Sequence, residues 1–393
     1  MIYQEKIGLS LEEYREKAKR VQQRMAECDL DAILCYGDEG IYANIDYLTR
    51  YYPAFEVGGV LLGRTGDPLV LIGGESVEFA AMTPYGIDAV RACTAFGHPA
   101  GGVRGWLGVK FYTLVDLLDE ISDGKPIKRI GLPDFSMFPY RLYRSLQEAC
   151  PNAELVDCTD IMTNIRMEKT AGEIALIRRA CEISEQAFTN GLGKITPEMT
   201  EYQLEGVFIN EMLSLGGEFP AFPVMCYAGY HSRQGIGRNT HQPVGKNTMI
   251  NVDFGCRYGG YSSAYDRPFV FGKMTDQMKR EIDFMQDVHQ KVVYEWVKPG
   301  TTSGEVYEKY YNYFLIHGYD APPASASHGI GVMEGEPPTF RRNIPTVLKA
   351  GMTCAADHFF RSDEYGFRYE DVYLIGENGN EMFTNGNMGY IQL

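Results

Sequence analysis

The chain has 393 residues, of which 45% are hydrophobic and 23% charged, so it is long enough to bury a sizeable core and to form two domains. Its 37 basic and 52 acidic residues give a net charge of −15, which argues against nucleic acid or an anionic membrane surface as a partner. We expect a cytoplasmic protein with reduced thiols, because there is no apolar signal segment or membrane-length apolar stretch and the nine cysteines form no C-x-x-C pair.

The first part of the chain alternates between helical and strand patterns. Ser10 and Glu13 form a capping box that predicts a helix ending near Cys28. Further elements are expected in this order: a strand over 31–36, a hairpin over 57–72 that turns at 64–67, a helix over 112–121, a strand over 129–132, a helix over 140–149 and a strand over 153–157. This pattern predicts an α/β domain over residues 1–162, whose glycine pairs lack the spacing of a phosphate-binding loop.

A second domain is predicted over residues 163–393. A capping box from Thr170 to Glu173 opens a long helix, and further capping boxes begin at Thr200 and Thr302. In both halves of this domain a long helix and a capped helix precede strands. The repetition predicts two α-α-β-β halves whose sheets face each other across a cleft.

The stretch 248–272 predicts a β-hairpin that carries acidic side chains. Alternation in its first arm gives one fully apolar face, so Asp253 points to the opposite face. A turn centred between Tyr258 and Gly259 would pair Asp253 with Ala264, and Asn251 with Asp266. The alternative is a surface hairpin with solvated acids.

Other polar residues interrupt apolar strands and glycine turns downstream. Asp357 ends the apolar run Met352–Ala356, where an unpaired carboxylate would be costly, and Glu370 lies inside the strand pattern FRYEDVYLI. His241 and His328, taken singly, also fit a surface and a turn histidine. Together, a set of acids and one histidine predicts a site for a metal ion or a cationic ligand: Asp253, Asp266, His328, Asp357 and Glu370.

The order of these motifs resembles the pita-bread fold family, which includes methionine aminopeptidase, aminopeptidase P, prolidase and creatinase. The resemblance rests on VDFG-x5-Y-x4-D-R, H-G-I-G, G-M-x4-D and G-F-R-Y-E-D, and on the linker IRMEKTAGEIALIRRA. It covers nearly the whole chain and is strongest to the prolidase and creatinase branch. It implies an α+β fold, with a pita-bread catalytic domain preceded by a smaller α/β domain, and a homodimer that acts on a small molecule.

The peptidases of this family bind two metal ions through two aspartates, one histidine and two glutamates. Position by position, these ligands correspond to Asp253, Ala264, His328, Asp357 and Glu370. Ala264 cannot ligate a metal, and a second histidine of the peptidases falls on Gly335. A metal-dependent Xaa-Pro dipeptidase or aminopeptidase is therefore the alternative hypothesis, with one Mn, Fe, Co or Zn ion on Asp253, His328, Asp357 and Glu370.

The departures favour creatinase, the metal-independent branch, so the leading hypothesis is a hydrolase without a cofactor that cleaves a C–N bond in a small guanidino or amidine compound. The resemblance implies His241 as the base, with His328 and Glu370 also catalytic. It assigns substrate binding to a second set: Asp253, Asp266, Asp357, Arg341 and Arg342. Two carboxylates can orient a planar cation through charge-assisted hydrogen bonds. A further alternative is a protein that keeps the fold and binds a ligand without turning it over.

Overall fold

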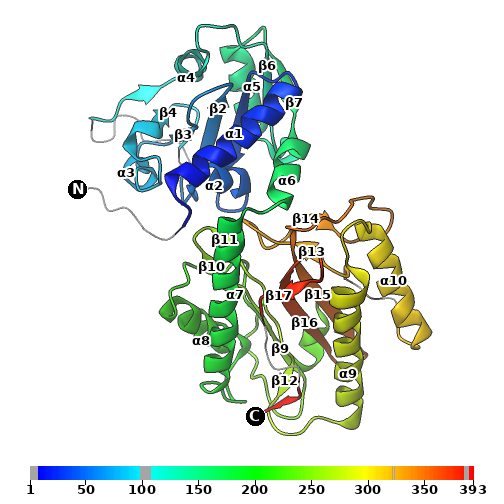
Figure 1. Ribbon diagram of the computed structural model, residues 1–393. Coiled ribbons are helices and arrows are strands. Elements are labelled where there is room, and N and C mark those ends of the chain that lie inside the picture. Colours follow the sequence, from blue (N-terminus) through cyan, green and yellow to red (C-terminus); the bar gives the residue numbers. More distant parts are fainter. Residues whose placement is uncertain (1–7, 98–107, 321, 323, 385–388) are drawn as a thin grey trace. The chain divides into compact units, whose positions relative to one another are not determined.

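The computed structural model describes residues 8–97, 108–320, 322, 324–384 and 389–393. The chain divides into two compact units, Met1–Arg166 and Met167–Leu393, each with its own sheets and helices (Figure 1). Among the residues described, no helix is both long enough and apolar enough to cross a membrane.

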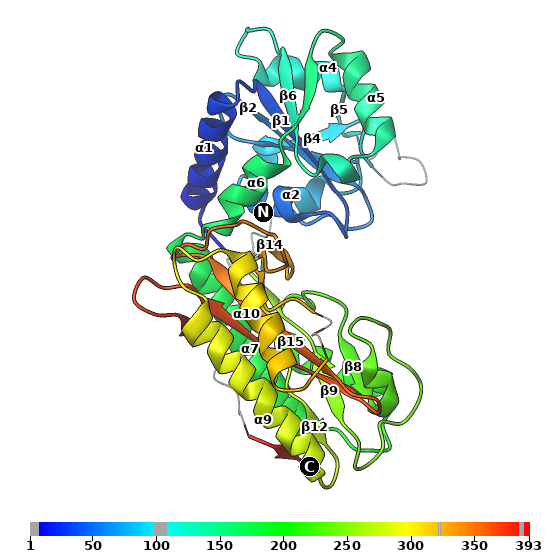
Figure 2. The same ribbon diagram turned by 90° about the vertical axis from the view of Figure 1, so that its right-hand side faces the viewer.

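The first unit is a seven-stranded mixed sheet flanked by helices. Its strands are β1 (Ala32–Gly37), β2 (Gly58–Gly63), β3 (Leu69–Ile72), β4 (Val90–Cys93), β5 (Phe111–Tyr112), β6 (Arg129–Leu132) and β7 (Glu154–Asp157), in the order β5-β4-β3-β2-β1-β6-β7. Its helices are α1 (Leu11–Glu27), α2 (Ala43–Thr49), α3 (Val77–Ala80), α4 (Leu114–Ile121), α5 (Tyr140–Ala149) and α6 (Thr159–Met167). Helix α1 lies on one face of the sheet and α4 and α5 on the other (Figure 2).

Local sequence signals account for these elements. Ser10 and Glu13 form the predicted capping box of α1, and β2 and β3 form the predicted antiparallel hairpin, with Gly59 opposite Leu71. The apolar residues of alternate strand positions, such as Ala32 and Leu34, pack against α4 and α5. The α/β architecture predicted for this part of the chain is therefore correct.

The first half of the second unit packs two helices against a four-stranded sheet. The helices are α7 (Ala171–Leu192) and α8 (Glu201–Ser214); the sheet has the order β18-β12-β9-β8, with β8 (Met225–Ala228), β9 (Ile250–Asp253), β12 (Phe269–Val270) and β18 (Ile391–Gln392). Phe188 of α7 and Phe208 of α8 stack with ring centroids 5.9 Å apart and cover the apolar face of β9. That burial leaves Asp253 on the face turned toward the other half.

The second half repeats this plan with a five-stranded sheet. Its helical part is α9 (Asp276–Gln290), a π-helical turn (Lys291–Trp296) and α10 (Ser303–Ile316); its sheet has the order β14-β13-β15-β16-β17, with β13 (His328–Gly329), β14 (Glu336–Thr339), β15 (Thr353–Arg361), β16 (Gly366–Leu374) and β17 (Glu381–Met382). Figure 1 shows α7 and α8 on one side of the two sheets and α9 and α10 on the other. This is the predicted arrangement of two facing halves.

The two sheets are joined where the acidic residues lie. The backbone N–H of Asp266 donates to the carbonyl of Glu370 over 3.3 Å, and the N–H of Glu370 donates back over 3.2 Å. Within the second sheet, Asp357 of β15 lies directly opposite Glu370 of β16. Residues more than 100 positions apart are thereby brought together.

The register of the central hairpin differs from the predicted one. The short strands β10 (Arg257–Tyr258) and β11 (Tyr261–Ser262) pair around a turn centred between Gly259 and Gly260, whose φ angles are 59° and 85°. A two-residue hairpin turn of this kind needs positive φ at both central residues, which the two glycines supply. Asp253 is therefore level with Asp266 instead of Ala264. Each side chain stays on its predicted face of the hairpin, because the pairing partner changes by two residues.

Candidate metal and substrate site

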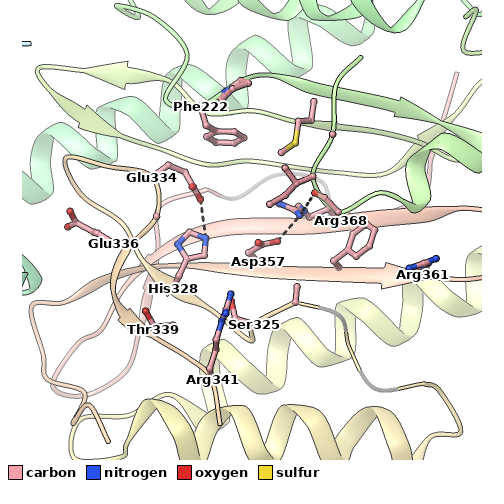
Figure 3. A pocket seen from close by; sticks show the side chains of 18 of the residues that line it. Phe222, Ser325, His328, Glu334, Glu336, Thr339, Arg341, Asp357, Arg361 and Arg368 are labelled. Atoms are coloured by element: carbon pink, nitrogen blue, oxygen red, sulfur yellow. Dashed lines mark hydrogen bonds and ion pairs between the residues drawn. The ribbon is translucent and has the colours of Figure 1, made fainter. Parts of the chain in front are cut away.

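A cavity of about 850 Å³ opens in the second unit beside β15 and β16 (Figure 3). Phe222, Ile236 and Phe359 give it apolar walls. Its cationic lining consists of five arginines: Arg233, Arg238, Arg341, Arg361 and Arg368. His328, Glu334 and Asp357 also line it, so one cavity combines an acidic and histidine-bearing part with a basic part.

Arg368 links the two sheets beneath this cavity. Its Nη1 donates to Oδ2 of Asp253 over 2.7 Å, and its Nε lies 3.3 Å from Oδ1 of Asp357. Its Nη2 donates to the carbonyl of Gly235 over 2.9 Å, which ties the loop after β8 to the site. Arg368 and Glu370 are two residues apart in one strand and thus share a face, a signal that the sequence offered and that sequence reasoning missed.

The buried carboxylates here are held in an unfavourable environment for negative charge. Burial raises the pKa of Asp253 to about 6, with Arg368 opposing the shift and Asp357 adding to it. Burial and the neighbouring Asp357 and Asp253 raise the pKa of Glu370 well above its usual value. Neither carboxylate oxygen of Glu370 has a hydrogen-bond partner among the described residues. Such a cluster is stabilised by an added cation or by protons.

His328 presents its Nε2 atom to two of these acids. Its Nδ1 lies 3.0 Å from the carbonyl oxygen of Gly329, so this nitrogen carries the proton and donates. Nε2 lies 3.0 Å from Oε1 of Glu334 and 3.7 Å from Oε1 of Glu370. Although burial lowers the pKa of His328, the carboxylate of Glu334 more than offsets this and holds it well above the usual value. Glu334, next to the position of the absent second histidine, was missed by sequence reasoning.

The donor set fits one divalent cation. Ligand atoms of His328, Glu334 and Glu370 lie within 4.8 Å of one another, and an imidazole with two carboxylates suits zinc, iron, cobalt or manganese. A two-metal arrangement does not fit these residues. Ala264 is fully buried and offers only a methyl group, and Asp253 is already ion-paired with Arg368.

Five of the eight predicted site residues are not among the residues that line the cavity. Asp253 and Glu370 are buried and contact the lining, Asp253 through Arg368 and Glu370 near His328. His241 is exposed, with its ring 4.8 Å from that of Tyr202, and it is not among the lining residues. Arg342 is exposed and donates to Glu308 over 2.7 Å. Asp266 is fully buried and accepts a hydrogen bond from Asn251 over 3.0 Å, so it lies behind the lining instead of in it. By contrast, His328, Asp357 and Arg341 do line the cavity.

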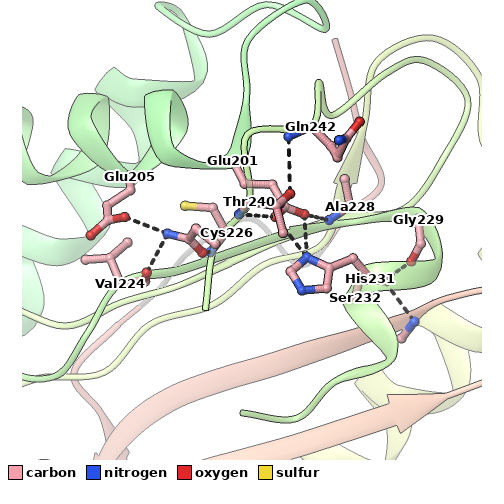
Figure 4. Close-up of polar contacts among 12 residues, drawn as sticks. Glu201, Glu205, Val224, Cys226, Ala228, Gly229, His231, Ser232, Thr240 and Gln242 are labelled. Carbon is pink, nitrogen blue, oxygen red and sulfur yellow. Dashed lines mark hydrogen bonds and ion pairs between the residues drawn. The ribbon is translucent and has the colours of Figure 1, made fainter. Parts of the chain in front are cut away.

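A buried glutamate anchors the loop that contributes Arg233 and Ile236 to the cavity. Glu201, the first residue of α8, accepts hydrogen bonds from the backbone N–H of Ala228 over 3.0 Å and from Nδ1 of His231 over 2.8 Å. It also accepts from the N–H and the hydroxyl of Thr240, each over 2.8 Å (Figure 4). Both ends of the segment 228–240 are thus fixed to one carboxylate at a helix N-terminus. His241 directly follows this anchored segment and is exposed.

Known proteins share both units. Residues 175–377 match the model of Metallopeptidase family M24, and residues 17–168 match that of the Creatinase/Prolidase N-terminal domain. The chain is 28% identical over 371 residues to the "Uncharacterized peptidase YqhT" of Bacillus subtilis, covering 94% of this chain and 98% of that protein. It is also 28% identical over 371 residues to a Xaa-Pro dipeptidase of Pyrococcus horikoshii, covering 94% and 97%.

Solved structures share the fold. An X-Pro aminopeptidase from Thermotoga maritima superposes with a TM-score of 0.81 at 21% identity, covering 96% of this chain and 99% of that one. A Xaa-Pro dipeptidase from Bacillus anthracis superposes with a TM-score of 0.79 at 22% identity, covering 97% and 100%. The predicted fold, a pita-bread domain preceded by a smaller α/β domain, is confirmed.

These comparisons contradict two predictions. The leading hypothesis of a metal-independent, creatinase-like hydrolase is contradicted by relatives that are named Xaa-Pro dipeptidases and by a metallopeptidase family model. The expectation of no cofactor fails for the same reason. The loss of one ligand at Ala264 was taken as loss of all metal, but the remaining donors still suit one ion. The prediction of a hydrolase that acts on C–N bonds is confirmed for the family, because a peptidase cleaves the C–N bond of a peptide. Because the model of Metallopeptidase family M24 matches more than half of this chain, the chain belongs to that family.

Proposed function

We propose that this protein is a divalent-metal-dependent peptidase that cleaves small Xaa-Pro peptides. The observation that carries the proposal is the convergence of His328, Glu334 and Glu370, of which His328 and Glu334 line a cavity of about 850 Å³. A cavity of this size suits a ligand of a few residues. The relatives named Xaa-Pro dipeptidase supply the substrate class.

The apolar walls and the arginines of the cavity have different roles in substrate binding. Phe222 and Phe359 offer apolar surfaces against which a proline ring packs. Arg238 and Arg341 offer donors for the carboxylate at the peptide's C-terminus, since guanidinium groups bind carboxylates through paired hydrogen bonds. Together these contacts orient the scissile bond toward His328 and Asp357.

The acidic part supplies the chemistry. A divalent ion held by His328 and Glu370 would polarise the carbonyl of the scissile bond and stabilise the negative charge that develops on it. Asp357 faces the cavity and is placed to accept the proton of the attacking water and to return it to the leaving nitrogen. Arg368 keeps Asp357 and Asp253 in place through its ion pairs with both.

A peptidase assay tests this function. Protein stripped with a chelator is tested on Xaa-Pro dipeptides, on longer peptides with proline second, and on matched peptides with alanine in place of proline. We expect no cleavage without metal and cleavage of the proline peptides after addition of Mn²⁺, Co²⁺ or Zn²⁺. Metal-loaded, folded protein that cleaves none of these peptides would contradict the proposal.

We also propose that the protein acts in the cytoplasm as a homodimer. All nine cysteines are free thiols, which fits a reducing compartment. The dimer is supported by the resemblance to the prolidase and creatinase branch. Light scattering coupled to size exclusion measures the mass directly, and a monomer at micromolar concentration would contradict it.

A further inference from the structure

The positions that carry metal ligands in the family do not supply a full ligand set in this chain, and another acidic residue lies close enough to contribute one. At those positions, Ala264 offers no atom that could bind a metal, and the carboxylate of Asp253 forms an ion pair with Arg368 at 2.7 Å. Glu334, which is not one of those positions, instead lies 3.0 Å from Nε2 of His328. We propose that the metal centre of this protein holds a single divalent ion, with Glu334 as a ligand beside His328 and Glu370.

The orientation of His328 supports ligation through Nε2. Its Nδ1–H is fixed on the carbonyl of Gly329, 3.0 Å away, and this leaves Nε2 directed at the two glutamates. A hydrogen bond from the other ring nitrogen to a backbone carbonyl is a common support for a metal-bound histidine. The fixed imidazole therefore offers one nitrogen ligand at the point where the carboxylates meet.

The burial of Glu370 independently favours a cation beside its carboxylate. Its side chain is 1% exposed, and neither of its oxygens has a hydrogen-bond partner in the part of the chain that the structure describes. A buried carboxylate with unsatisfied oxygens is costly unless a cation accompanies it. An ion placed among Nε2 of His328 and the carboxylates of Glu334 and Glu370 would satisfy it.

Arg368 explains why one ion is sufficient. Its guanidinium contacts Asp253 through Nη1 and Asp357 through Nε, so a fixed positive charge already accompanies these two carboxylates. With Ala264 in place of a carboxylate, there is also less negative charge for a second ion to neutralise. The arginine and one divalent ion together supply three positive charges against the four carboxylates of Asp253, Asp357, Glu334 and Glu370, which leaves less negative charge than a second divalent ion would neutralise.

Metal binding measured without substrate tests this inference, which rests on the metal dependence of the proposed function. Chelator-stripped protein is titrated with Mn²⁺ by calorimetry, and bound metal is counted by elemental analysis. We expect one ion per chain and, for Glu334→Gln, a dissociation constant raised by about tenfold or more. Asp253→Asn should change it by less than about threefold, and the exposed Glu364→Gln is the matched control.

Circular dichroism checks that each variant is folded, and Glu334→His keeps a metal ligand at the position. We expect that variant to bind Co²⁺ with an altered visible absorption spectrum. Two ions per chain, or unchanged binding by Glu334→Gln together with lost binding by Asp253→Asn, would overturn the inference. A chain that binds one ion through Glu334 yet cleaves no peptide would overturn only the proposed function. A chain that cleaves Xaa-Pro peptides with two ions would overturn only this inference.

Discussion

Arg368 donates from Nη1 to Oδ2 of Asp253 over 2.7 Å, and this ion pair joins the two sheets of the second unit at the first ligand position of the family. Both side chains are largely buried, at 11% and 1% exposure. Removing one partner of a buried ion pair leaves an uncompensated charge, which typically costs about 3–5 kcal/mol. We therefore expect Arg368→Met to lower the free energy of unfolding by about that amount, measured by urea denaturation.

A lysine at this position should not restore the lost stability. The Lys ammonium is a single point charge and cannot reach Asp253, Asp357 and the carbonyl of Gly235 together, as the guanidinium does. Arg361→Met, at the exposed end of the same cavity, is the control and should change stability by no more than about 0.5 kcal/mol. If Arg368→Met were as stable as that control, the ion pair would not hold the sheets together.

Restoring the lost ligand should create a metal requirement for stability. Ala264 is fully buried, and a carboxylate added there lies without a cation of its own. We expect Ala264→Asp to lower the melting temperature in the presence of a chelator, and Mn²⁺ to recover part of the loss. Ala264→Asn has nearly the same shape without the charge, so the difference between the two variants isolates the charge. Equal melting temperatures for both in chelator would contradict the prediction.

Helix starts and the hairpin glycines could be predicted from the sequence because their signals are local. The boxes that begin at Ser10, Thr170 and Thr302 are satisfied within four residues of chain, and each caps a helix in the structure. Gly259 and Gly260 likewise fix their own turn, although one residue separates the predicted centre from the observed one. Local chemistry thus determined which elements form.

Which residues make up the site depends on tertiary contacts that local sequence patterns do not reveal. Glu334 reaches His328 only because β13 and β14 pair around the connection that contains it. His241 was assigned by the resemblance to creatinase, but in the structure it is exposed beside Tyr202, directly after the anchored segment 228–240. Motif matches identified the family, but tertiary packing decided which donors meet.

A second buried ion pair offers a test that is independent of the metal. Nζ of Lys169, just before α7, lies 2.9 Å from Oε1 of Glu336 in β14, and the two side chains are 1% and 2% exposed. We expect Lys169→Met to destabilise the protein by about 3–5 kcal/mol in urea denaturation. The exposed pair of Lys349 with Glu168 is the matched comparison, and Lys349→Met should cost less than about 1 kcal/mol. Similar losses of stability for both variants would show that burial does not determine how much an ion pair contributes to stability.

A buried histidine should make stability depend on pH. His289 of α9 is 1% exposed; burial and the nearby Arg267 lower its pKa to about 3, although Oδ2 of Asp371 lies 3.2 Å from its Nε2. Asp371 does not offset this because Arg267 already donates to both of its oxygens over 2.7 Å. His289 is therefore neutral in the folded protein throughout the physiological range.

In the unfolded chain the same histidine titrates near its ordinary pKa of about 6.5. Between pH 6.5 and 3 the unfolded state therefore binds more protons than the folded state, and the stability contributed by neutral His289 is complete above pH 6.5 and is lost as the pH falls. The slope is about 1.4 kcal/mol per pH unit for one group. Carboxylates such as Asp253, whose pKa is raised to about 6, act in the opposite direction, so the effect of His289 has to be isolated by a variant.

We expect the free energy of unfolding of the wild type to fall by about 2 kcal/mol more than that of His289→Leu between pH 6.5 and pH 5, measured by urea denaturation at each pH. Any constant cost of the substitution cancels, because only the change with pH is compared. Parallel pH profiles for the two proteins would mean that His289 is protonated in the folded state and pairs with Asp371. In that case Arg267 would have to share Asp371 with a second cation, and the polar network behind the site would carry one more positive charge.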